Sequence, residues 1–189
     1  MQYLINLLKN PIGVIQVEEL AALSLKDFYT ITDLINLSFH KEEQMAFRAA
    51  WVLERIYSNH QSKFLPHISL FLERIPHQQN LSALRHYVKI LAFMTKKNAA
   101  EDVQQIINEY DTNNLAEIVF GWLIDERIPV AVKSHCLNIL ANLCHKHSWI
   151  KDELPETMDY LIDKESIAFF AKVKQIRKQL KNKTLIKRL

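Results

Sequence analysis

Three segments of the chain begin alike, and this self-similarity restricts the possible folds more than any other feature. Each has an alanine followed by an apolar and a basic residue, with another apolar residue five positions after the alanine. The alanines are Ala46, Ala83 and Ala131, and a fourth segment without the basic residue begins at Ala168. They are 37, 48 and 37 residues apart, which indicates a recurring unit of 37 residues with one insertion of 11. A period of about 20 to 50 residues is typical of stacked repeat units.

The repeated unit is expected to be helical. Apolar residues recur at spacings of three and four, for example at Ala46, Ala49, Leu53 and Ile56, which places them on one face of a helix. Alternating runs of β-branched residues, which would indicate strands, do not occur. The chain has only 2 glycines, so it contains neither a dinucleotide-binding fingerprint nor a phosphate-binding loop.

Each repeat is predicted to be a pair of amphipathic helices, and neither helix can bury its apolar stripe without neighbours. The predicted pairs are Leu25–Phe39 with Glu42–Tyr57, Pro66–Ile75 with Leu81–Thr95, Leu115–Asp125 with Pro129–His145, and Pro155–Asp163 with Ser166–Leu180. Ser24 is the expected N-cap of the first pair, and Pro66, Pro129 and Pro155 are expected in first helical turns. Asp111 and the three residues after it indicate a cap and turn.

A single domain is expected over residues 1–189, because no low-complexity segment or long linker interrupts the chain. We expect it to consist of an N-terminal cap over 1–24, two repeats over 25–95, an extra helix over 96–114, two repeats over 115–180 and a basic tail over 181–189.

This organisation resembles the HEAT/armadillo-type α-solenoids over roughly Leu25 to Leu180. HEAT-like repeats often carry an acid a few residues before the basic residue of the second helix. Glu42 stands six residues before Arg48 and fits this pattern, whereas the equivalent positions before Arg85 and Lys133 are Gln79 and Arg127. The resemblance implies an all-α fold, a right-handed α-α superhelix of about four helical hairpins plus one extra helix with no strands. It also implies a general role as a binding surface.

In such solenoids the second helices usually line the concave face, so basic and aromatic residues on them are candidates for partner binding. The candidates are Arg48, Trp51, Arg55, Arg85, Lys89 and Lys133. Trp51 lies within about 60° of Arg48 and Arg55 around the helix, so it has the place to stack on a partner side chain or a nucleobase. In the alternative interpretation, the basic residues pair with acids of their own or the next repeat, and Trp51 fills the core between repeats.

The C-terminal segment is strongly basic. Residues 164–189 hold nine basic residues and one acid, a net charge of +8, whereas the rest of the chain carries −5. The residues of this segment that we single out are Lys172, Lys174, Arg177, Lys178 and Lys181. One hypothesis is that they attract phosphates or an acidic patch. The other is a terminal capping helix, which packs Phe169, Val173, Ile176 and Leu180 inward and keeps its lysines in water.

The sequence offers no pattern that supports catalysis, a metal or a cofactor. Cys136 and Cys144 are eight residues apart on one predicted helix, about 12 Å, which is too far for a disulfide. Adjacent helical residues such as Cys144 and His145 point about 100° apart and do not readily share a metal ion. Reduced thiols, together with the lack of a secretory signal or membrane-spanning segment, predict a cytoplasmic protein.

Two functions are therefore expected in order of preference. The first is a non-catalytic scaffold that binds a protein partner on the concave face. The second is nucleic-acid binding, with the basic C-terminal segment as a contact. It includes a DNA glycosylase for alkylated bases, because some HEAT-like proteins resemble such enzymes and have a cleft lined by Trp, Arg and Asp. The charge of −5 outside the C-terminal segment argues against wrapping a duplex.

Overall fold

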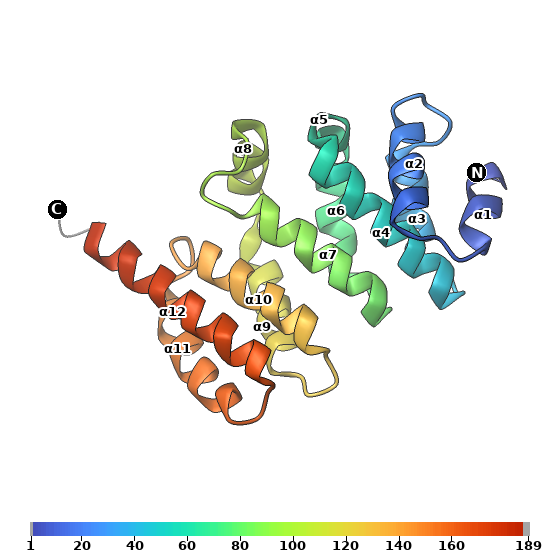
Figure 1. The fold of residues 1–189 in the computed structure, drawn as a ribbon. Coiled ribbons are helices and arrows are strands. Elements are labelled where there is room, and N and C mark those ends of the chain that lie inside the picture. The colour runs from blue at the N-terminus through green and yellow to red at the C-terminus, as the bar shows by residue number, and fades with distance from the viewer. Residues whose placement is uncertain (1, 187–189) are drawn as a thin grey trace.

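The chain folds into two layers of helices that form an elongated, curved stack (Figure 1). The structure is a computed structural model that describes residues 2–186, with side chains described as far as Lys181. No strand occurs in this part of the chain, so the predicted all-helical repeat fold is confirmed.

Each repeat consists of a first helix and a second helix, as their order along the chain shows. The first helices are α3 (Ile31–Leu37), α6 (Ile68–Arg74), α9 (Thr112–Ile124) and α11 (Ser148–Ile162). The second helices are α4 (Glu43–Asn59), α7 (Leu81–Met94), α10 (Val130–Leu143) and α12 (Ile167–Ile186). The remaining elements are α1 (Gln2–Lys9), α2 (Val14–Ser24), α5 (Gln61–Phe64), α8 (Glu101–Glu109) and two short 3₁₀ turns, η1 (Leu65–His67) and η2 (Ile75–His77).

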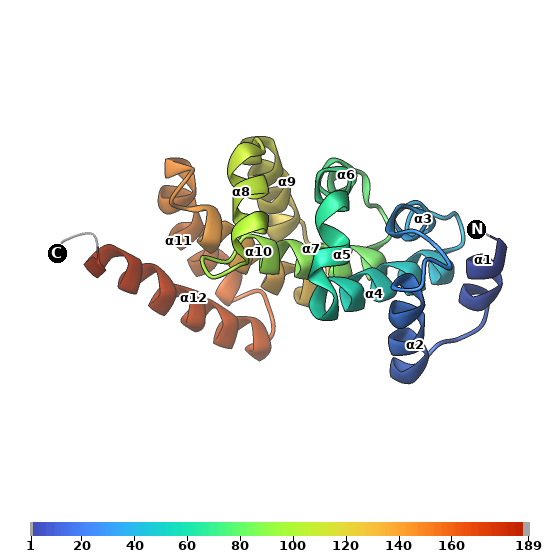
Figure 2. The ribbon, with the colours of Figure 1, turned by 90° about the horizontal axis from the view of Figure 1, so that it is seen from above.

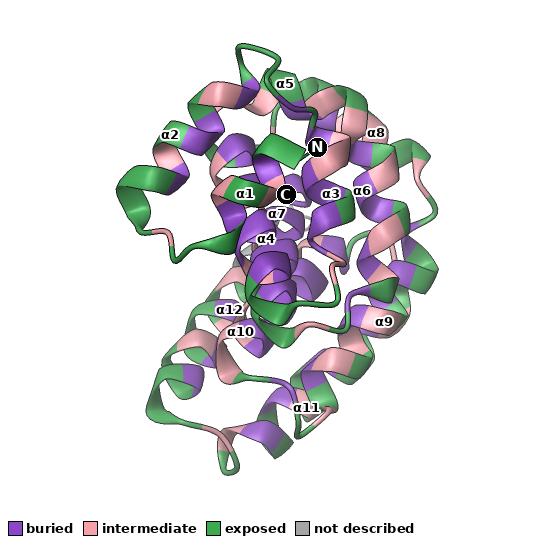
Figure 3. Ribbon diagram, turned by 90° about the vertical axis from the view of Figure 1, so that its right-hand side faces the viewer, coloured by how far each residue is buried: buried purple, intermediate pink, exposed green. Residues whose placement is uncertain are grey.

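The second helices form one continuous row, because α4 packs on α7, α7 on α10, and α10 on α12. Figure 2 shows this row from above, with the first helices α3, α6, α9 and α11 together along one side of it. In Figure 3 the buried residues gather along α4 and α7 in the middle of the molecule. Between the two layers, Phe71 of α6 stacks on Tyr87 of α7 with ring centroids 4.6 Å apart. The core is therefore shared by neighbouring repeats, as the apolar stripes require.

Several helices begin at the capping residues that their sequences supply. The Asp111 side chain accepts a hydrogen bond from the backbone N–H of Asn113 at 3.0 Å and caps α9, as predicted. The prediction that Ser24 is an N-cap is wrong, because Ser24 is the last residue of α2 and its hydroxyl donates to the carbonyl oxygen of Ala21. The first repeat begins instead at Thr30, which forms a capping box with Asp33.

The prediction for Pro155 is also wrong, because this proline lies inside α11 rather than in its first turn. The helix begins seven residues earlier, at Ser148, where His147 is the N-cap. Proline lacks the N–H that would bond to the carbonyl of Lys151, so it normally favours the start of a helix. Burial of Ile150, Leu154, Met158 and Leu161 along one face outweighs this loss.

The two ends of the stack differ in their construction. Helices α1 and α2 both pack on α4 and cover the N-terminal end. The insertion between the second and third repeats contains α8, which contacts α7. At the C-terminal end α12 continues to Ile186, so the described helix contains most of the predicted basic tail, and residues 187–189 lie outside the described part of the chain.

Candidate functional site

Three positions recur on the inner side of every second helix, at spacings of three and four residues. We call them the inner-face residues: Arg48, Trp51 and Arg55 on α4, His86, Lys89 and Phe93 on α7, His135, Asn138 and Asn142 on α10, and Lys172, Gln175 and Gln179 on α12. Most are half-buried, whereas on α4, α7 and α10 the residues between them are mainly buried in the interfaces between helices. This spacing keeps all three positions on one helical face.

Eight of the inner-face residues line a groove of about 400 Å³ that crosses α7, α10 and α12. The rest of its lining includes Lys96, Lys97 and Asn98 from the segment after α7. Of the residues that the structure describes, four lysines line this inner groove, namely Lys89, Lys96, Lys97 and Lys172, and no carboxylate does. Its other polar lining is mainly amide side chains, so the groove combines positive charge with groups that both donate and accept hydrogen bonds.

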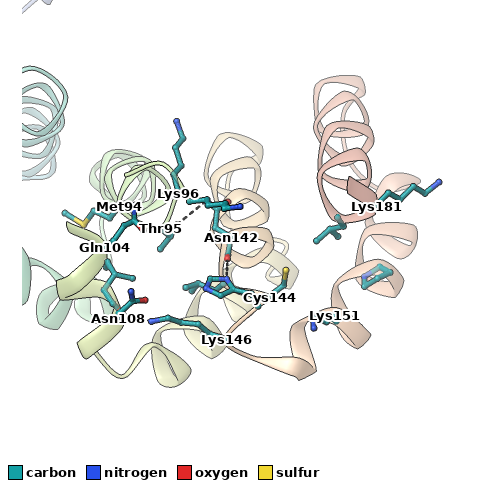
Figure 4. A pocket seen from close by; sticks show the side chains of 16 residues that line it. Met94, Thr95, Lys96, Gln104, Asn108, Asn142, Cys144, Lys146, Lys151 and Lys181 are labelled. Atoms are coloured by element: carbon teal, nitrogen blue, oxygen red, sulfur yellow. Dashed lines mark hydrogen bonds between the residues drawn. The ribbon is translucent and has the colours of Figure 1, made fainter. Parts of the chain in front are cut away.

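Asn142 connects the three helices at the floor of the inner groove. Its amide nitrogen lies 3.3 Å from the Thr95 hydroxyl oxygen and 3.4 Å from the Ala92 carbonyl oxygen of α7. Its amide oxygen accepts a hydrogen bond of 3.0 Å from the Gln179 amide of α12. The contact between Thr95 and Asn142 is drawn in Figure 4. These bonds fix the relative positions of α7, α10 and α12 where the groove crosses them.

Glu54 of α4 holds two inner-face residues of α7. Its carboxylate contacts the Nδ1 atom of His86 and the Nζ atom of Lys89, each at 2.5 Å. Burial alone would raise the pKa of Glu54, but the hydrogen bonds to His86 and Lys89 outweigh it and lower the pKa from 4.5 to about 2. Lys89 is therefore oriented by a carboxylate that stays ionised, and the residue also lines the groove.

An aromatic cluster covers the inner face of α4 next to this ion pair. The ring of Trp51 lies 5.8 Å from that of Phe47 and stacks on His86 at 6.3 Å. His86 is buried, and its Nε2 atom has no hydrogen-bond partner among the described residues. The inner face therefore changes along the stack. On α4 it presents the Trp51 ring between Arg48 and Arg55, whereas on α10 and α12 it presents amides, His135 and Lys172.

His135 lies among the cations of the inner groove. Burial, followed by the charges of Lys89 and Lys172, lowers the pKa of His135 from 6.5 to about 4. The pKa of Lys172 is also lowered, by burial and by the charge of Lys96. A neutral imidazole in a positive field donates one hydrogen bond and accepts another, so His135 adds polarity to the groove without adding charge.

The structure places three of the predicted binding residues in internal contacts. Arg48 is buried, and one guanidinium nitrogen donates to the carbonyl oxygens of Leu8 and Lys9 at 2.9 Å each, at the end of α1. Arg55 pairs with Glu18 of α2 at 3.1 Å. Lys133 is only 1% exposed and contacts Glu165 at 2.5 Å.

The other predicted residues lie closer to the surface. Arg85 is exposed, Lys89 lines the inner groove, and Trp51 is half-buried in the aromatic cluster. Within the C-terminal segment, Lys172 lines the groove and Arg177 pairs with Asp159. Lys174, Lys178 and Lys181 are exposed. A binding role for all of these residues stays a prediction.

Sequence analysis did not select most residues of the groove. The unpredicted residues are His135, Asn138 and Asn142 on α10 and Gln175 and Gln179 on α12, whereas Lys172 was predicted only as a residue of the basic C-terminal segment. The signal that identifies them is the spacing of Arg48, Trp51 and Arg55, which recurs on each later second helix.

Catalytic and metal-binding arrangements are not evident in the described part of the chain. Both cysteines are free and buried, and burial raises the pKa of the Cys136 thiol, which disfavours the reactive thiolate. No group of three or more His, Cys, Asp or Glu side chains there is placed to hold a metal ion. Within the same residues, no helix has the length and hydrophobicity needed to cross a membrane.

Comparison with known proteins identifies the repeat. A family model described as a HEAT repeat domain matches residues 4–183, nearly the whole chain. No curated protein matches the sequence. The family match extends to α1 on one side and to the basic part of α12 on the other, beyond the segment that the repeated alanines indicate.

Proposed function

Because the chain belongs to the HEAT repeat domain family, we propose that it is a non-catalytic scaffold that binds an acidic segment of a protein partner in the inner groove. The observation that carries this proposal is the lining of the groove, which has four lysines and no carboxylate. Stacked helix pairs provide a large, preformed curved surface, so a partner can bind without ordering loops.

The amides of the groove favour a peptide as the bound segment. Asn98, Asn138, Asn142, Gln175 and Gln179 line it. The amides of Asn98 and Asn138 make no hydrogen bond among the described residues and offer both donors and an acceptor, whereas those of Asn142, Gln175 and Gln179 are partly used in internal hydrogen bonds. A peptide backbone needs both kinds of partner, whereas acidic side chains need the lysines. Lys96 and Lys97 have no carboxylate partner among the described residues, and the Lys96 ammonium group lies over the Phe93 ring, 4.3 Å from its centroid. Neither charge is therefore neutralised before a ligand binds.

A binding measurement with paired charge reversals tests this proposal. The probe is a short fluorescein-labelled peptide of alternating Glu and Ala, and fluorescence anisotropy reports its binding at about 50 mM salt. We expect the double variant Lys96→Glu/Lys97→Glu to weaken binding by roughly tenfold or more. The control Lys26→Glu/Lys41→Glu makes the same charge change at exposed positions outside the groove. Equal loss of affinity in both variants would contradict the proposal.

Nucleic-acid binding is the second candidate, and the same four lysines support it. Single-stranded DNA in place of the peptide distinguishes the two, because phosphate contacts give a steep dependence of affinity on salt. Tighter binding of the DNA than of the peptide, lost in Lys96→Glu/Lys97→Glu, would favour nucleic acid. Glycosylase activity has less support, because Arg48 and Arg55 are engaged with α1 and α2.

A further inference from the structure

A second and larger cavity of about 780 Å³ adjoins the inner groove. It lies between α7, α8 and α10 on one side and α11 and α12 on the other. Figure 4 shows Met94, Gln104 and Asn108 on the first side and Lys181 on the second. We propose that this end cavity binds an amphiphilic anion, a small molecule with an alkyl or aryl body and one carboxylate, sulfonate or phosphate group.

The walls of the end cavity are suited to the apolar body of such a ligand. Met94, Ile107, Leu143, Pro155 and Leu180 contribute to them. A volume of about 780 Å³ falls within the range of about 300 to 1,000 Å³ that is usual for small-molecule sites. Removing an alkyl chain from water is favourable in proportion to its length, so the hydrophobic effect contributes to binding of the apolar body.

The charges around the end cavity select the sign of the polar group. Among the described residues, five lysines line it, namely Lys96, Lys97, Lys146, Lys151 and Lys181, and no carboxylate does. None of the five pairs with a carboxylate among the described residues. Ammonium groups without a carboxylate partner beside apolar walls favour an anionic head group and disfavour a cationic one.

A hydrogen bond fixes the position of Lys146 at the end cavity. Its Nζ atom donates a hydrogen bond of 2.8 Å to the carbonyl oxygen of Ile107, near the end of α8. Burial lowers the pKa of Lys146, because its ammonium group has lost part of its hydration. In Figure 4 its side chain extends along the α8 side of the cavity. An anion bound there would replace the interactions with water that the Lys146 ammonium group loses on burial.

Dodecanoate is a suitable probe, and dodecyltrimethylammonium provides the same chain with the opposite charge. Isothermal titration calorimetry below the critical micelle concentrations is expected to give one dodecanoate per chain, bound at least about tenfold more tightly than the cation. Equal affinity for the two amphiphiles would overturn the proposal.

Paired variants locate the site. Lys151→Glu/Lys181→Glu reverses two exposed lysines of the end cavity, and we expect it to weaken dodecanoate binding at least fivefold. The control Lys174→Glu/Lys178→Glu makes the same charge change on α12, at exposed residues outside the lining, and is expected to change affinity less than twofold. A comparable loss in the control would overturn the proposal, since the tail would then attract the anion without a defined site.

Other occupants of the end cavity would give different results. Leu180→Trp reduces the cavity without changing its charge and is expected to abolish dodecanoate binding. Binding to vesicles with anionic phospholipid but not to free dodecanoate would instead indicate a membrane surface and overturn the proposal. The proposal would also be overturned if Leu180→Trp weakened the binding of an acidic peptide but left the binding of dodecanoate unchanged. Lys151, Lys181 and Leu180 do not line the inner groove, so failure here leaves the proposed scaffold function intact.

Discussion

The contact between Lys133 and Glu165 joins α10 to the turn before α12, and its two partners differ in their access to water. The side chain of Lys133 is 2% exposed, whereas the side chain of Glu165 is 14% exposed. Removing one partner of a buried pair is costly because the other charge is left in an apolar site. The decrease in the free energy of unfolding should therefore depend on which of the two residues is replaced.

We expect Glu165→Ala to lower the free energy of unfolding by about 3 kcal/mol, because it leaves the Lys133 ammonium group buried and unpaired. Lys133→Met should cost less, since it keeps the packing of the stem and leaves only the more accessible carboxylate. Urea unfolding of both variants measures the difference. Equal losses would show that the ammonium group is hydrated when its partner is absent.

His135 provides a pH-dependent contribution to stability with a defined sign. Its pKa is about 4 in the folded chain, below its usual 6.5, so the unfolded chain binds more protons between these values. Stability due to His135 is therefore complete above pH 6.5 and is lost as the pH falls toward 4. The slope of this contribution is at most about 1.4 kcal/mol per pH unit.

The variant His135→Gln is expected to flatten the pH dependence of stability over this range, because glutamine stays neutral at every pH. Burial also lowers the pKa values of His67 and His147, so both contribute to the pH dependence of stability. The contribution of His135 is therefore the difference in the free energy of unfolding between the variant and the parent chain at each pH. Chemical unfolding at several pH values measures it. Parallel curves for the two proteins would show that His135 titrates normally in the folded state.

At the scale of helices, α12 closes the end of the stack. Phe169, Val173 and Ile176 are fully buried, whereas Phe170 beside them is half exposed to solvent. The spacing of these apolar residues predicted this inward face, and the structure confirms it. The outward face of α12 carries lysines where the other second helices carry apolar residues.

Phe169→Ala and Phe170→Ala make the same chemical change on opposite sides of this helix. We expect Phe169→Ala to lower the free energy of unfolding by about 3 to 5 kcal/mol, because it opens a cavity between α12 and its neighbours. Phe170→Ala should change it by roughly 0.5 kcal/mol or less. Thermal unfolding followed by circular dichroism compares them. Similar losses in the two variants would contradict the burial of one face of α12.

Helix positions were more predictable than the register between repeats. The predicted second helices agree with α4, α7 and α10 to within two residues at either end, because their apolar stripes are long. The repeated alanines align Arg48 with Arg85, whereas the pattern of burial aligns Arg48 with His86 and His135. One residue corresponds to about 100° around a helix, so this shift moves a side chain from the groove to another face.

The contacts of individual basic residues were less predictable because they depend on distant segments. Arg48 meets carbonyl oxygens of α1, about forty residues away, and Glu165 reaches Lys133 across a helix pair. Neither partner follows from local spacing. The end cavity likewise lies between α7, α8 and α10 on one side and α11 and α12 on the other, and no motif in the sequence indicates it.

At the scale of the whole molecule, the stacked repeats give an elongated shape (Figure 1). A compact domain of 189 residues has a radius of gyration of about 16 Å. We expect small-angle X-ray scattering to give a clearly larger value and an asymmetric distribution of interatomic distances. A value at or below that of a compact domain would show that the stack closes on itself in solution.

The change from rings on α4 to amides and lysines on α10 and α12 also gives the inner face a direction. A strand lying along it would place one end against the Trp51 ring, beside two arginines that are held in contacts with α1 and α2, and the other end among amides and lysines. Turned end for end, the same strand would set its charges against indole and phenyl edges. Repeats of one architecture with different inner-face residues can thus produce a surface that distinguishes the two directions of a bound chain.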